Sequence, residues 1–179
     1  MVYLFLVDGY EDTEMIAPFD MLCRADIPVT RVGVTGKTVV SKLGIAMSAD
    51  ITADELDLSD CEMIFLPGGP GTKHYFHQPV IDKAIAYCLE HDCYMAAICA
   101  APSVLSAKGV LQDKKAVCHF SVNDKMDCAQ LLTNPYCVDG KVITGRGAAA
   151  SVDFGLALVA ALRGEEAAQK VKHAICYPD

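Results

Sequence analysis

The sequence predicts an α/β protein of the flavodoxin-like type, a three-layer sandwich in which helices cover both faces of a mostly parallel sheet. Short, continuously apolar runs such as residues 2–7 and 63–66 are typical of strands buried on both faces. Longer stretches with apolar residues at helical spacing separate these runs, so strands and helices alternate along the chain. Right-handed crossovers between parallel strands then complete the three layers.

The expected elements follow one another without an internal repeat or a linker, which predicts a single domain over residues 1–179. Strands are expected at 2–7, 28–34, 63–66, 94–98 and 116–118, with hairpins within 36–49 and 136–144. Helices are expected at 11–25, 79–90, 101–108, 148–162 and 165–172, the first with Pro18 as an awkward interior residue.

Composition excludes several classes of protein. Of the 179 residues, 53% are hydrophobic and 21% charged, which is a globular balance rather than that of a disordered chain. The net charge of −8 disfavours a nucleic-acid partner. No apolar run reaches the ~18 residues that span a bilayer, and the N-terminus lacks the basic region of a signal peptide. We therefore expect a cytoplasmic protein with no membrane partner.

The cysteines do not indicate a metal or a disulfide framework. Their number is odd, their spacing is irregular and no CxxC motif occurs, so we expect most to be buried free thiols. His74 and His77 lie three residues apart but have no third ligand at a suitable spacing. We expect no metal and no cofactor. The nine cysteines are Cys23, Cys61, Cys88, Cys93, Cys99, Cys118, Cys128, Cys137 and Cys176.

Chemically versatile residues follow four of the predicted strands. Sites in such folds lie beyond the carboxyl ends of the strands. The first strand is followed by the acid-rich segment 8–14, the strand 63–66 by Gly68 and Gly69, the strand 94–98 by Cys99, and the strand 116–118 by His119. We expect these groups to meet at one edge of the sheet.

Cys99 is the strongest single candidate, since small residues flank it in AICAA and permit a sharp strand-to-helix elbow. The N-terminus of the following helix would stabilise a thiolate, and we expect the thiol pKa to fall by about 2–3 units. Cys99 would then be the most acidic and most oxidisable of the cysteines. The alternative is a buried thiol that only fills a gap.

The other candidates have structural explanations that the residues alone leave open. Gly68 and Gly69 form either a tight loop or, with the amide of Ala100, an oxyanion hole. Glu14 either complements a helix dipole or takes part in chemistry, and for catalysis it should keep a proton at neutral pH. His119 is either a satisfied loop histidine or a catalytic one.

Several segments carry a resemblance that runs from end to end of the chain. These are EDTEMIAPFDMLCRADIPVT, FLPGGPG, AAICAAPSVL, KAVCHFSVNDKM and VITGRGAAASVDFGLALVAAL, with EEAAQKVKHAICYPD as a terminal helix. The chain resembles the ThiJ/PfpI superfamily and most closely its DJ-one branch. By position, Cys99 is similar to the family's elbow cysteine, Glu14 to the carboxyl group that hydrogen-bonds it and His119 to the pocket histidine. The amides of Gly69 and Ala100 resemble the oxyanion hole.

The resemblance also implies a homodimer in which the helix 11–25 packs across a two-fold axis. We expect Met15 and Arg24 near that axis, and Arg24 and Arg146 in structural roles near the site and the interface. One departure bears on function: the protease-like branch has a histidine directly after the nucleophile, and Ala100 stands there instead. The Arg146–Ala149 loop also departs from the arginine-glycine-proline-glycine pattern of the DJ-one branch.

The resemblance implies glyoxalase activity without glutathione, and reversal of early glycation adducts. Cys99 would add to the aldehyde of a small carbonyl substrate such as methylglyoxal, and Glu14 or His119 would move a proton between the two carbons before hydrolysis. A second hypothesis is a redox sensor or redox-controlled chaperone that uses an oxidisable cysteine. A cysteine peptidase or amidase is a third, disfavoured by Ala100.

Overall fold

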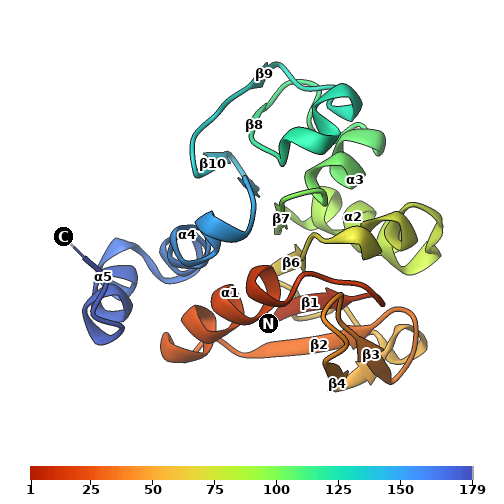
Figure 1. The fold of residues 1–179 in the computed structure, drawn as a ribbon, viewed down its shortest axis with the longest axis horizontal. Coiled ribbons are helices and arrows are strands. Elements are labelled where there is room, and N and C mark those ends of the chain that lie inside the picture. The colour runs from red at the N-terminus through yellow and green to blue at the C-terminus, as the bar shows by residue number, and fades with distance from the viewer. Residues whose placement is uncertain (179) are drawn as a thin grey trace.

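A computed structural model describes residues 1–178 and confirms the predicted class (Figure 1). The middle layer is a seven-stranded sheet in the order β10-β11-β7-β6-β1-β2-β5, parallel except for the pair β10–β11. Its strands are β1 (Val2–Leu6), β2 (Val29–Gly33), β5 (Ile51–Thr52), β6 (Met63–Leu66), β7 (Tyr94–Ile98), β10 (Tyr136–Asp139) and β11 (Val142–Gly145).

Helices form the two outer layers. They are α1 (Asp12–Arg24), α2 (Pro79–His91), α3 (Pro102–Ala107), α4 (Ser151–Arg163) and α5 (Glu165–Ala174). In Figure 1, α1 and α4 lie on one side of the sheet, α2 and α3 on the other, and α5 lies outside α4. Among residues 1–178, no helix is both long and apolar enough to cross a bilayer.

Strand β1 shows how the sequence forms two cores. Tyr3 and Phe5 pack under α2 and α3, whereas Leu4 and Leu6 pack under α1 and α4. Successive side chains of a strand point to opposite faces, so a continuous apolar run fills both cores at once. The sheet is thereby fixed between two helical layers, and the carboxyl ends of β1, β6 and β7 lie side by side.

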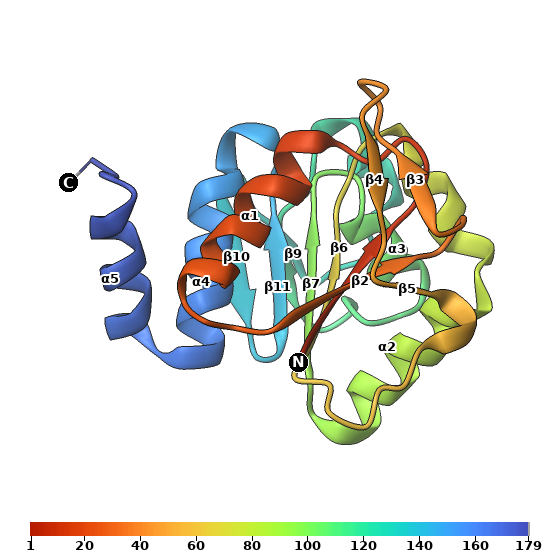
Figure 2. The ribbon, with the colours of Figure 1, turned by 90° about the horizontal axis from the view of Figure 1, so that it is seen from below.

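A hairpin caps that end of the sheet, as Figure 2 shows above the beginning of α1. Its strands are β3 (Thr38–Val40) and β4 (Ala46–Ser48), which pair antiparallel as expected. The amide of Gly9 donates to the Val40 carbonyl at 2.8 Å, and the Val40 amide donates to the Asp8 carboxylate at 2.8 Å. The loop after β1 therefore holds the hairpin over the carboxyl ends of the strands.

Two expectations about the C-terminal half are corrected. The strand expected at 116–118 is β8 (Lys115–Ala116), which pairs with β9 (Gln130–Leu131) in a separate small sheet and not in the central one. The helix expected from residue 148 begins with a 3₁₀ turn (Ala148–Ala150) that leads into α4. Three other 3₁₀ segments, Ala53–Glu55, Pro70–His77 and Phe120–Lys125, were not foreseen.

Pro18 lies in the interior of α1, where proline is unfavourable for a helix, as the sequence indicated. At this point α1 packs closely against α4. A Cβ atom on Gly155 would lie 2.8 Å from Pro18 Cα and 2.8 Å from Met21 Cγ. Glycine at this position lets the two helices approach closely. Proline also removes the amide that would have bonded the Glu14 carbonyl one turn earlier.

We predict that Gly155→Ala lowers the free energy of unfolding by about 1–3 kcal/mol, since the added methyl group overpacks the contact between α1 and α4. This loss should exceed the ~1 kcal/mol by which alanine favours a helix over glycine. Denaturant unfolding followed by circular dichroism measures the difference. A variant at least as stable as the original chain would show that the two helices have room to spare.

Candidate active site

Cys99 lies on a strained elbow between β7 and α3. Its φ of 65° places it in the left-handed region, which costs a non-glycine residue about 1–2 kcal/mol. Two backbone hydrogen bonds hold the turn: the Cys99 amide donates to the Gly145 carbonyl at 2.9 Å, and the His119 amide donates to the Cys99 carbonyl at 2.8 Å. The residue is partly exposed, so the strained turn presents the thiol to a pocket.

Gly68 makes room for a close approach of two side chains. A Cβ atom there would lie 2.5 Å from Glu14 Oε2 and 2.6 Å from Cys99 Cβ. The neighbouring Gly69 has a φ of 97°, which favours glycine. The amides of Gly69 and Ala100 both interact with the Cys99 sulfur. The glycine loop predicted from the sequence is therefore more than a tight turn, because it allows Glu14 and Cys99 to meet and places an amide beside the Cys99 sulfur.

Glu14 is buried in the first turn of α1, with only 2% of its surface exposed. Burial is the main cause that raises its pKa from 4.5 to about 7, with a smaller contribution from the negative charge of Glu11. Its Oε2 atom has no hydrogen-bond partner among residues 1–178. The prediction of a raised pKa at Glu14 is confirmed, and a carboxyl group with this pKa can both donate and accept a proton near neutral pH.

The predicted fall in the pKa of Cys99 is wrong. Burial, and after it the adjacent Glu14 carboxylate, raise the pKa of this thiol to about 12, against a lowering by the amides of Gly69 and Ala100. The helix that was to stabilise a thiolate is also shorter than expected, beginning only at Pro102. The structure therefore favours a protonated Cys99 next to the Glu14 carboxyl group.

His119 lines the same pocket although its strand is not part of the central sheet. Its ring Nδ1 accepts a hydrogen bond from the Ser121 amide at 3.3 Å and lies 2.8 Å from Ser121 Oγ. Because Nδ1 accepts, Nε2 carries the proton in the neutral ring. The backbone bond from His119 to Cys99, not membership of the sheet, holds the imidazole at this edge.

The pocket has a volume of about 500 Å³ and is lined by Glu14, Gly69, Cys99, Ala100 and His119 together. Four of the predicted strand ends thus converge as expected. The sequence missed three cationic residues that also line the pocket, Lys42, Lys73 and Lys125. Lys42 comes from the β3–β4 turn and forms an ion pair with Glu11.

The remaining predicted residues lie outside this pocket. Arg24 is exposed at the end of α1 and pairs with Asp20 at 2.8 Å. Arg146 donates to the Thr133 carbonyl and so holds a loop, as a structural role requires. Met15 is fully buried within its own chain. Its side chain packs inward against the sheet and is not available for contact with a partner, while its position near a two-fold axis stays a prediction.

Comparison with known proteins identifies the family. A profile of the DJ-1/PfpI family matches residues 1–161, so the chain belongs to this family. It is 28% identical over 168 residues to a glutathione-independent glyoxalase of Caenorhabditis elegans, covering 93% of this chain and 90% of the relative. It is 30% identical over 182 residues to the Parkinson disease protein 7 homolog of Danio rerio, covering 98% and 96%.

Solved structures agree with this assignment. An oxidised DJ-1 of Toxoplasma gondii superposes with a TM-score of 0.94 at 26% identity, over 99% of this chain and 98% of that one. The DJ-1beta protein of Drosophila melanogaster gives a TM-score of 0.92 at 26% identity, with the same coverage of both chains. The architecture predicted from the alternation of strands and helices is that of the family.

We predict that pH changes the stability of the chain through Glu14. Below pH 4.5 the carboxyl group is protonated in both the folded and the unfolded chain; between pH 4.5 and about 7 only the unfolded chain ionises it. Stability is therefore lost as the pH rises through this window, by about 3 kcal/mol in all. Glu14→Gln should not show this loss, so the stability of the variant relative to the original chain should increase as the pH rises through this window.

Urea unfolding of both proteins at a series of pH values measures the difference, with the exposed Glu166→Gln as the control. A constant difference between Glu14→Gln and the original chain would mean that Glu14 ionises as freely in the folded state as in the unfolded one.

Proposed function

We propose that the chain is a glutathione-independent glyoxalase that converts a 2-oxoaldehyde such as methylglyoxal to a 2-hydroxy acid. One observation carries this proposal: a buried carboxyl group with a pKa of about 7 lies against a thiol that opens into a pocket. A carboxyl group of this kind can move protons at neutral pH, as an internal conversion of an oxoaldehyde requires. The activity named for the Caenorhabditis elegans relative supports the same reaction.

In the first step, the Cys99 sulfur attacks the aldehyde carbon. Because burial and the carboxylate keep Cys99 protonated, the Glu14 carboxylate takes the thiol proton as the carbon–sulfur bond forms. Glu14 then passes this proton to the aldehyde oxygen, which becomes the hydroxyl group of a hemithioacetal. The amides of Gly69 and Ala100 are placed to stabilise the developing oxyanion.

In the second step, Glu14 removes the proton from the former aldehyde carbon and returns it to the neighbouring carbonyl carbon through an enediol. This transfer oxidises the first carbon to a thioester and reduces the second to an alcohol, so no external oxidant is needed. Water then hydrolyses the thioester, which releases the 2-hydroxy acid and the Cys99 thiol. His119 is the alternative proton carrier, since its Nε2–H belongs to the same pocket.

Early glycation adducts are a second substrate class, because they are hemithioacetals or hemiaminals of a 2-oxoaldehyde. With such an adduct, Cys99 would form its carbon–sulfur bond as the thiol or amine of the adduct leaves with the proton that Glu14 took from Cys99, and the later steps are the same. A redox-sensing role uses different properties of the same residues: a protonated Glu14 could donate to an oxidised Cys99 sulfur. Peptidase activity is disfavoured because Ala100 replaces the histidine that would pair with the nucleophile.

We also propose that the chain forms a homodimer through α1. The exposed face of that helix, and not the buried Met15, would contact the second copy. Ile16 is 45% exposed on α1, beside the half-buried Phe19. Burial of such apolar surface against a second copy would stabilise an isologous pair.

Ile16→Asp should convert this dimer to a monomer, because it places a charge in an apolar contact. Sedimentation equilibrium measures the mass. The matched control is Leu89→Asp, which changes an exposed leucine on α2 at the opposite face and should leave the dimer intact. A monomer of 19.2 kDa for the unmodified chain would refute the proposal.

For the proposed activity, we predict that Cys99→Ser abolishes turnover of methylglyoxal and that Glu14→Gln lowers it by about 100-fold or more, since glutamine cannot transfer a proton. In the unmodified chain, kcat/KM should rise with pH up to about 7, where Glu14 becomes ionised and able to accept the thiol proton. Assays of lactate formation without glutathione measure both effects.

Cys128→Ser is the matched control, because it removes a half-buried thiol that lies outside the pocket, and it should keep full activity. Near-normal turnover in Glu14→Gln would leave His119 as the proton carrier. Turnover that survives Cys99→Ser would refute the proposed function itself.

A further inference from the structure

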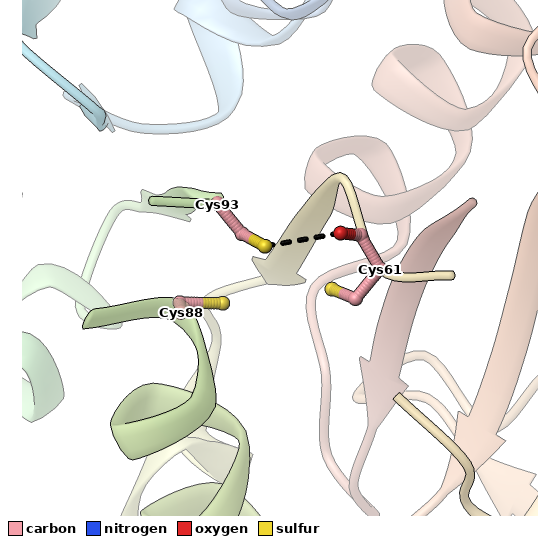
Figure 3. A group of neighbouring side chains, drawn as sticks. All are labelled: Cys61, Cys88 and Cys93. Atoms are coloured by element: carbon pink, nitrogen blue, oxygen red, sulfur yellow. Dashed lines mark hydrogen bonds between the residues drawn. The ribbon is translucent and has the colours of Figure 1, made fainter. Parts of the chain in front are cut away.

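Three thiols meet at the end of the sheet opposite to Cys99. Cys61 comes just before β6, Cys88 lies in the last turn of α2 and Cys93 comes just before β7. Their three sulfur atoms all lie within 4.8 Å of one another. Figure 3 shows the three side chains directed toward a common space. The sequence, which lacks a CxxC motif, predicted no such cluster.

Local structure explains why residues so differently spaced come together. Asp92 adopts a left-handed conformation, with a φ of 54°, at the end of α2. This turn lets the Cys93 amide donate to the Cys88 carbonyl at 3.1 Å and reverses the chain. Cys61 is brought alongside by the parallel pairing of β6 with β7, and its carbonyl accepts a bond from Cys93 Sγ at 3.0 Å.

The cluster is separate from the candidate active site. Cys99 lies six positions after Cys93, at the other end of β7, which corresponds to roughly 20 Å of extended chain. None of the three cysteines lines the pocket around Cys99. The three thiols are therefore not used by the proposed reaction.

We propose that Cys61, Cys88 and Cys93 form a binding site for one thiophilic metal cation, with Cu(I) as the preferred ion. A metal–sulfur distance of about 2.3 Å places three sulfur ligands about 4 Å apart around a trigonal ion. The observed spacing requires the sulfur atoms to move together by less than an ångström. Thiolate ligands select soft cations such as Cu(I) and Zn(II) over Mg(II) or Ca(II).

The number of ligands favours Cu(I). Within residues 1–178, the group of closely spaced cysteine, histidine and carboxylate ligands stops at these three. Structural zinc sites almost always have four protein ligands, whereas three thiolates complete a trigonal Cu(I) site. Binding replaces three thiol protons by one cation, which leaves a charge of −2. The N-terminal amine, near Cys61, and Lys141, near Cys93, partly offset this charge.

The three thiols differ in their exposure to solvent. Cys61 is half-buried while the other two are buried, so it offers the entry to the site. A cation would bind Cys61 first and would then be coordinated by Cys88 and Cys93 as well.

Titration of the reduced chain with Cu(I) in the absence of oxygen, against a coloured Cu(I) chelator, tests the proposal. All proteins carry Cys99→Ser, so that the thiol of the active-site pocket does not compete. We expect one tightly bound ion per chain. Cys61→Ser should weaken this binding by at least about 100-fold, the upper range for loss of a group that only supports a metal ligand. Cys128→Ser, which removes an equally half-buried thiol outside the cluster, should bind as before.

X-ray absorption of the loaded chain supplies a second measurement that needs no substitution within the cluster. We expect three sulfur neighbours around the copper. Three results would each overturn the assignment. Cys61→Ser could bind Cu(I) as tightly as the Cys99→Ser chain, Cys128→Ser could lose as much Cu(I) affinity as Cys61→Ser, or the copper could have fewer than three sulfur neighbours. Turnover of methylglyoxal by Cys61→Ser with Cys99 intact should be unchanged, so this result is independent of the proposed function.

Discussion

The contact between the Glu14 carboxyl group and the Cys99 thiol is the interaction on which the candidate site depends. It exists because Gly68 has no side chain: any Cβ atom would lie within 2.6 Å of both groups. The contact also joins the three elements that end at this edge, since Glu14 belongs to α1, Gly68 follows β6 and Cys99 follows β7. Burial of this pair raises the pKa values of both groups, and the proposed function depends on that shared environment.

The fold holds this contact in place from both sides. One core fixes α1 against the sheet, and the close approach of α1 to α4 at Gly155 sets the position of the helix that carries Glu14. The other core fixes α3 behind the elbow, where Cys99 keeps a left-handed conformation. Strain at such a position persists only where the surroundings over-determine it. The same parallel strands carry a second thiol cluster at their opposite ends, so one sheet positions two separate sets of sulfur atoms.

Much of this arrangement could be predicted from the sequence, because it depends on local pattern. Apolar runs located β6 and β7 correctly, and the rule that sites lie beyond strand ends brought Glu14, Gly69 and Cys99 together. The rest depends on tertiary structure. The pKa of Cys99 follows from burial and from a carboxylate distant in sequence, which helix-dipole reasoning omits. Lys42 reaches the pocket only because the β3–β4 hairpin folds over the carboxyl ends of the strands. Met15 points inward because of the orientation of α1, and the spacing of apolar residues does not determine that orientation.

The central claim is that Cys99 rests as a thiol, because burial and the charge of Glu14 oppose its ionisation. The most direct measurement is the rate of alkylation of Cys99 as a function of pH, followed by mass spectrometry of the peptide that contains it. We expect the rate in the unmodified chain to keep rising beyond the ordinary thiol pKa of about 8.5, because burial and the Glu14 charge raise the pKa of Cys99 to about 12. In Glu14→Gln, which lacks that charge, the rise should move to lower pH. A rate that already reaches its plateau below neutral pH in the unmodified chain would show a resting thiolate and would contradict this account.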